Sequence, residues 1–137
     1  MTAALPTARV IVSLPTANLR RAFEFYRSGL GLTLSVASEG DAMPEPVTFK
    51  LNEGLQLMLV PTTGFGWVIG DHAVAPAGSS ECVLGLAAKT PTEVDLIIAR
   101  AIAAGATVVA DPAEQRWGYS GSFADPDGHV WLIVAQA

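Results

Sequence analysis

Charged residues are scarce in this chain, and basic ones are scarcer than acidic ones. Only 15% of the 137 residues are charged, with 8 Lys and Arg against 13 Asp and Glu and a formal net charge of −5. A nucleic-acid surface needs clustered Lys and Arg to bind phosphates, so we expect no nucleic-acid partner. Half of the residues are hydrophobic, which is enough for a sizeable core and argues against disorder.

Cysteine is also scarce, and long apolar runs are missing. Cys82 is the single cysteine, so no internal disulfide can form and a reducing cytoplasm is the expected compartment. No run approaches the roughly 18 uninterrupted apolar residues that a membrane-spanning helix needs. Arg9 interrupts the N-terminal stretch where a signal peptide requires an apolar core. We therefore expect a cytoplasmic protein without membrane contact.

What the sequence does contain is an internal repeat with an offset of 74 residues. Residues 31–34 align with residues 105–108, and the same offset places Phe49 on Phe123. It also places Val60 on Val134. A period this long is not that of a solenoid, and two copies indicate a duplicated module.

Each copy predicts a strand, a helix and then three strands. In the first copy, alternation predicts a strand at 10–14, and Asn18 is the expected cap of a helix that ends at Gly29 and Gly31. In the second copy, Thr90 to Glu93 form a capping box. The remaining elements are expected at 32–36, 47–51 and 55–60 in the first copy, and at 82–88, 91–104 (helix), 106–110, 119–124 and 129–134 in the second.

The fold class that follows is α+β, with duplicated βαβββ modules forming a curved mixed sheet around a concave cleft. We expect a single domain over residues 1–137. It comprises a first module at 8–60, a linker or lid at 61–79 and a second module at 80–137.

Three motifs then occur in a characteristic order. The first helix reads Phe25-Tyr26-Arg27 and is followed by Gly29-Leu30-Gly31-Leu32; the second ends in Ala103-Ala104-Gly105-Ala106; the last hairpin reads Phe123-Ala124-Asp125-Pro126-Asp127-Gly128-His129. Together they resemble the vicinal oxygen chelate superfamily, the glyoxalase/bleomycin resistance protein/dioxygenase group. The resemblance covers nearly the whole chain apart from the first few residues and the linker, and it implies the fold described above.

Metal-dependent members of this family hold a divalent ion with His, Glu or Gln side chains at four inward-facing strand positions. The resemblance places these positions at Ile11, Met58, Val83 and Leu132. All four are apolar, whereas such ions need oxygen or nitrogen ligands. We therefore expect no metal, no cofactor and no metal-dependent glyoxalase or extradiol dioxygenase chemistry.

Other residues are candidates for contact with a ligand. Strand alternation puts Gln56 and Val60 on the same face as Met58, which gives a largely apolar cleft. The glycine-framed segment 64–70 is either a lid or a segment packed on the core edge or a subunit interface. Trp117 and Tyr119 either stack on an aromatic ligand or pack in the protein. The candidate ligand-binding residues are Ile11, Gln56, Met58, Val60, Phe65, Trp67, Arg116, Trp117, Tyr119 and Leu132, with no catalytic residue among them.

Binding is the function that this pattern favours. By resemblance to the bleomycin-resistance type, we expect a metal-free homodimer that sequesters an aromatic or hydrophobic compound such as an antibiotic. The alternative is a metal-independent enzyme, isomerase-like or lyase-like. That enzyme needs a general base, for which the sequence offers only Glu53, Glu81 and His129. An accessory module without a small ligand is a third hypothesis.

Overall fold

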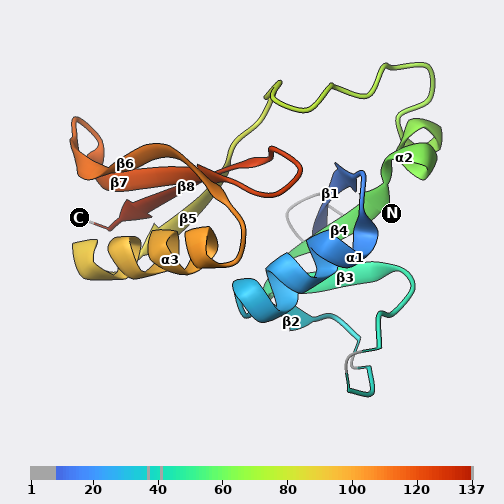
Figure 1. Ribbon diagram of the computed structural model, residues 1–137, viewed down its shortest axis with the longest axis horizontal. Helices are drawn as coiled ribbons and strands as arrows, with labels where there is room; N and C mark the ends of the chain where they lie inside the picture. Colours follow the sequence, from blue (N-terminus) through green and yellow to red (C-terminus); the bar gives the residue numbers. More distant parts are fainter. Residues whose placement is uncertain (1–8, 37, 41, 137) are drawn as a thin grey trace, which may run out of the picture. The chain divides into compact units, whose positions relative to one another are not determined.

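The computed structural model describes residues 9–36, 38–40 and 42–136, which form two compact units divided between Val74 and Ala75. Each unit contains a strand, a helix and three further strands, and these form a four-stranded mixed sheet with a helix along one face (Figure 1). The predicted α+β fold of duplicated βαβββ modules is therefore confirmed, with one sheet in each module.

The βαβββ part of unit 1 contains six elements. These are β1 (Val10–Thr16), α1 (Leu19–Glu24), the π-helical turn η2 (Phe25–Gly29), β2 (Thr33–Leu34), β3 (Val47–Asn52) and β4 (Leu55–Pro61). The strand order is β1-β4-β3-β2, with β1 parallel to β4 and the other neighbours antiparallel.

Unit 2 repeats this topology. Its elements are β5 (Leu84–Ala88), α3 (Pro91–Ala103), β6 (Thr107–Gln115), β7 (Gly118–Ala124) and β8 (Val130–Ala135). The strand order is β5-β8-β7-β6, and β5 is again parallel to its neighbour.

Both predicted helix starts are confirmed by their caps. Asn18 Oδ1 accepts a hydrogen bond from Arg21 N at 3.0 Å, and Thr90 Oγ1 accepts one from Glu93 N at 3.1 Å. These bonds satisfy backbone donors that the first turn of a helix leaves free. The first helix ends through η2, and Gly31 follows it with a positive φ of 76°.

The repeat reappears in the register of the sheets. Phe49 lies opposite Leu57, and Phe123 lies opposite Trp131, so the offset of the sequence repeat holds across both antiparallel pairs. Phe49 and Phe123 are both fully buried on the face that packs against the helix of their own unit. In unit 1 the ring of Phe23 on α1 stacks on Phe49, with 6.3 Å between ring centroids. Each module therefore has an aromatic core between helix and sheet.

One helix was not expected, and several strand boundaries differ from the expectation. The segment predicted as an irregular linker contains a short helix, α2 (Thr62–Val68), although Gly64 and Gly66 are poor helix formers. Strand β5 starts at Leu84, two residues later than expected. Strand β6 continues to Gln115 because its irregular pairing accommodates Pro112 at the edge of the sheet. No helix among the described residues is both long enough and apolar enough to cross a membrane.

Candidate functional site

Each sheet has one face packed on a helix and a second face, which we call its open face. In unit 1 the buried Leu57 and Leu59 belong to the packed face, so their neighbours on β4 belong to the open face. Residues paired in register share a face, which extends this set to β1 and β3. The open face of unit 1 consists of Ile11, Ser13, Pro15, Thr48, Lys50, Gln56, Met58 and Val60.

The open face of unit 2 follows in the same way. Trp131 and Ile133 are buried on the α3 side, and the residues between and around them on β8 point the other way. The register adds small residues from β5 and hydroxyls from β7. This open face consists of Gly85, Ala87, Ser120, Ser122, Ala124, Val130, Leu132 and Val134.

The residues at the family's metal positions do not fit a metal ion. Met58 lies opposite Ser13 and Thr48, and Leu132 lies opposite Gly85 and Ser122. These side chains bring hydrocarbon, a thioether and hydroxyls together, whereas a divalent ion is held by imidazole or carboxylate groups. Among residues 9–36, 38–40 and 42–136, no group of three or more His, Cys, Asp or Glu is arranged to hold a metal. We derive no chemistry through a metal.

The open faces carry more hydroxyl groups than the sequence predicted. Gln56 is the polar residue that strand alternation placed on the same face as Met58. In addition, Ser13 and Thr48 flank Met58 in unit 1, and Ser120 and Ser122 lie beside the aliphatic residues of β8 in unit 2. The alternation of β3 and β7 carried this signal. This signal can be used only once the strand register shows which residues of β3 and β7 lie on the same face as Met58 and Leu132.

Trp117 lies in the tight turn between β6 and β7, where Gln115 pairs with Gly118. Its indole Nε1 donates a hydrogen bond of 2.8 Å to Ser120 Oγ, on the open face of unit 2. Trp117 is nevertheless well exposed, at 62% of its full surface. Arg116 is exposed in the same turn. The structure therefore brings Trp117 to the open face that carries Leu132.

Tyr119 is placed on the other side of the same sheet. Its hydroxyl donates a hydrogen bond of 2.7 Å to Asp95 Oδ1 on α3. That bond to a carboxylate, with a smaller contribution from desolvation, raises the pKa of Tyr119 above its ordinary value of 10.0. Since its hydroxyl is engaged with α3, we leave Tyr119 out of the site proposed below.

The predicted lid residues Phe65 and Trp67 lie on α2, which follows β4 directly and contacts β1 and β4 (Figure 1). Gly64 at the start of α2 lies near Val60, an open-face residue of unit 1. Phe65 is half-buried, whereas Trp67 is 90% exposed. The two aromatic side chains of this segment therefore differ in how far the protein covers them.

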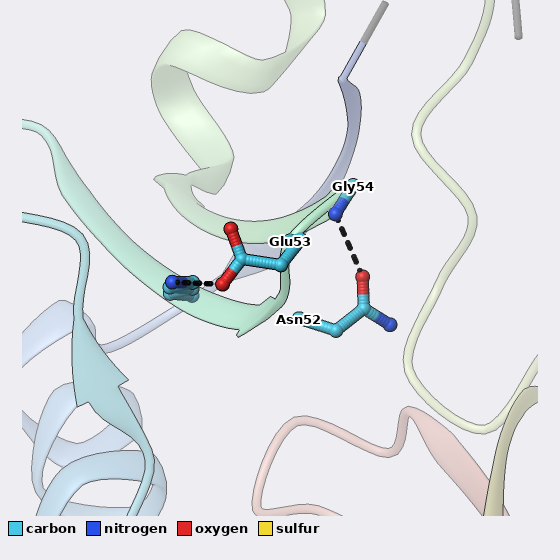
Figure 2. Close-up of polar contacts among 4 residues, drawn as sticks. Asn52, Glu53 and Gly54 are labelled. Atoms are coloured by element: carbon cyan, nitrogen blue, oxygen red, sulfur yellow. Dashed lines mark hydrogen bonds and ion pairs between the residues drawn. The ribbon is translucent and has the colours of Figure 1, made fainter. Parts of the chain in front are cut away.

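Glu53, one candidate general base, sits in the exposed turn between β3 and β4. Its carboxylate pairs with the Lys50 ammonium at 2.8 Å, while Asn52 Oδ1 accepts a hydrogen bond from Gly54 N at 2.9 Å (Figure 2). The hydrogen bond and charge of Lys50 hold the pKa of Glu53 below its ordinary value of 4.5. A general base at neutral pH needs the opposite shift, so this carboxylate is poorly suited to proton abstraction.

The other chemically reactive candidates lie in loops. The backbone N–H of His129 donates to Asp125 Oδ1 at 2.9 Å, as does that of Asp127, so Asp125 holds the last turn together. Glu81 and Cys82 are both exposed between α2 and β5. None of these side chains belongs to an open face as defined above.

A family model described as the Glyoxalase/Bleomycin resistance protein/Dioxygenase superfamily matches residues 9–133. No curated protein matches the chain in sequence.

Several solved structures are similar throughout. A glyoxalase/bleomycin resistance protein/dioxygenase from Nocardioides is 28% identical with a TM-score of 0.70, covering 98% of this chain and 85% of that one. A glyoxalase-related enzyme from Fulvimarina pelagi is 24% identical with a TM-score of 0.79, covering 95% and 88%. TnmS3, an antibiotic binding protein from Streptomyces sp. CB03234, is 22% identical with a TM-score of 0.68, covering 98% and 100%.

Proposed function

Because the chain belongs to the Glyoxalase/Bleomycin resistance protein/Dioxygenase superfamily, we propose that it is a metal-free binding protein for a small organic compound. The ligand class is aromatic or hydrophobic, such as an antibiotic, and the compound is held without being transformed. The description of TnmS3 as an antibiotic binding protein supports this choice within the family.

A single observation carries the proposal. The positions at which the family's metal ligands are expected are Ile11, Met58, Val83 and Leu132, which are all apolar, and the open-face residues in register with Ile11, Met58 and Leu132 offer no carboxylate or imidazole. Apolar surface of this kind gains free energy by excluding water, about 25 cal/mol for each square ångström buried. A hydrophobic ligand therefore suits these faces better than a chelated polar substrate.

In each unit taken by itself, the proposed ligand contacts come from its open face and from the segment beside that face. Apolar residues supply the surface, hydroxyl and amide groups orient the ligand, and indole rings stack on it. The proposed set is Ile11, Ser13, Thr48, Gln56, Met58, Val60, Phe65 and Trp67 in unit 1, and Arg116, Trp117 and Leu132 in unit 2.

The enzyme alternative requires a base among these contacts. Glu53 is paired with Lys50 and has a lowered pKa, and His129 belongs to the last turn. No observation favours isomerase or lyase chemistry, so we do not propose it. We keep the homodimer and the cytoplasm as parts of the proposal, since the exposed thiol of Cys82 suits a reducing compartment.

Native mass spectrometry of protein purified from its own host tests the proposal. We expect a noncovalent adduct whose released compound absorbs as an aromatic and is recovered unchanged after prolonged incubation with fresh protein. Conversion of that compound into a product by the purified protein would contradict the proposal and favour the enzyme.

A further inference from the structure

The indole of Trp117 combines high exposure with a buried hydrogen-bond partner. Trp117 is 62% exposed, whereas Ser120, which accepts its Nε1–H at 2.8 Å, is only 3% exposed. The indole N–H is the one polar group of a tryptophan side chain. Since Ser120 occupies it, Trp117 offers a ligand the face of its ring rather than a hydrogen-bond donor.

The backbone fixes the other end of this side chain. Gly118, the next residue, has a φ of +118°, a conformation that residues with a side chain rarely adopt. A Cβ built at Gly118 would lie 3.6 Å from Ala135 O and 3.9 Å from Val134 Cγ2, so the turn sits against the end of β8. The ring of Trp117 is thus held at its backbone by the turn and at its tip by Ser120.

Trp67 is an exposed indole that lacks the restraints found at Trp117. It is 90% exposed on α2, and no hydrogen bond holds its Nε1 among the residues that the structure describes. A side chain of this kind loses rotamer freedom when a ligand binds, whereas a side chain that is already fixed does not. Stacking of a ligand therefore costs more side-chain entropy at Trp67 than at Trp117.

We propose that Ser120 is a positioning residue, which fixes the indole plane of Trp117 as a stacking surface for a planar aromatic ring system. This inference rests on the proposed function and narrows its ligand class from hydrophobic compounds in general to flat aromatic ones. Ser120 acts through Trp117 and is itself too buried to contact the ligand directly.

The test uses acridone, a neutral, planar and fluorescent tricyclic compound, as the probe. We expect Ser120→Ala to move the Nε1–H resonance of Trp117 upfield, to speed its exchange with solvent and to raise the acridone dissociation constant about three- to tenfold. Ser120→Thr keeps a hydroxyl and should retain both the resonance and the affinity. Trp117→Phe keeps a ring without the N–H, and we expect it to bind as weakly as Ser120→Ala.

Tyr119→Phe is the matched control. It removes one hydroxyl and one side-chain hydrogen bond from the same strand, but on the α3 side, so acridone binding should stay within about twofold of the parent. If Tyr119→Phe weakened binding as much as Ser120→Ala did, general loosening of β7 would explain the effect and the positioning role would be wrong.

Two outcomes separate this inference from the proposed function. If Trp117→Ala weakens acridone binding while Ser120→Ala changes neither the Nε1–H resonance nor the affinity, Ser120 has no positioning role and the binding function stands. If the parent does not bind acridone, or Trp117→Ala binds it equally well, the aromatic-binding function itself is contradicted. Should Ser120→Ala fail to fold, the comparison of Ser120→Thr with Trp117→Phe decides the positioning role.

Discussion

At the scale of single residues, the proposed site depends on rings rather than on charges. The one cation of the unit 1 open face is Lys50, and Glu53 neutralises it at 2.8 Å. Arg116 is exposed in a turn, where solvent and salt weaken its interactions. Trp117, in contrast, is fixed with its ring face exposed.

We therefore expect Trp117→Ala to weaken the binding of an aromatic ligand about tenfold or more, as loss of an aromatic anchor does. Trp67→Ala should have a smaller effect of a few-fold, because ordering that side chain offsets part of its stacking. Arg116→Ala and high salt should change the affinity by no more than about twofold. Calorimetry in which Arg116→Ala or salt abolishes binding, while both tryptophan variants bind normally, would favour a charged ligand instead.

The carboxyl group of Glu53 provides a test of protonation. Its pKa is lowered by Lys50, so the stabilising contribution of the pair is present above about pH 4.5 and is lost as the pH falls through the folded-state pKa. In an NMR titration, we expect a midpoint below 4.5 that returns to about 4.5 in Lys50→Met. Lys89→Met is the control and should leave the midpoint unchanged. A titration midpoint of Glu53 above 4.5 would instead favour this carboxylate as a general base.

At the scale of elements, the β6–β7 turn is the most demanding local structure of the site. We expect Gly118→Ala to destabilise the protein by about 1–3 kcal/mol, because its φ of +118° is unfavourable for any residue with a Cβ. Gly85→Ala is the matched control, since that glycine has no positive φ and open space around its Cβ, and its cost should stay within about 0.5 kcal/mol. If thermal unfolding shows the same loss of stability for Gly118→Ala and Gly85→Ala, the positive φ of Gly118 is not the reason that the turn needs glycine.

Elements with strong local signals were predictable from sequence. The caps at Asn18 and Thr90 have the residues that helix starts require, and the repeat between Phe49 and Phe123 reflects the same core position in both modules. Helix α2 was missed because its two glycines oppose a helix in local propensity, and tertiary context overrides that preference. The bond from Trp117 to Ser120 joins a turn to a strand face, which no spacing rule reveals.

At the scale of the whole molecule, one edge of the unit 2 sheet lacks the usual protection against strand pairing. Strand β5 is an edge of the unit 2 sheet and contains neither a charged residue nor a proline, and Leu86 is exposed on it. Proteins usually protect such edges with charges, prolines or bulges, as Pro112 does on β6. Bare apolar edges favour pairing with a second copy, and closed two-fold symmetry is the commonest way to bury them.

We accordingly expect a homodimer in light scattering at micromolar concentration. Leu86→Lys should shift the protein toward the monomer, because it places a charge on the β5 edge. Leu96→Lys is the control, since Leu96 is exposed on α3 away from the sheet edges. A parent protein that is monomeric under these conditions, or equal dissociation of both variants, would contradict the edge interface.

The central claim is that the open faces bind an aromatic compound without a metal. Its most direct test is a calorimetric titration of acridone into the protein, first with a chelator and then with added Zn, Mn, Ni or Fe. We expect the same dissociation constant and the same enthalpy in every case, because Ile11, Met58, Val83 and Leu132 supply no ligand for these ions. Binding that disappears in the chelator and returns with a stoichiometric metal would contradict the account.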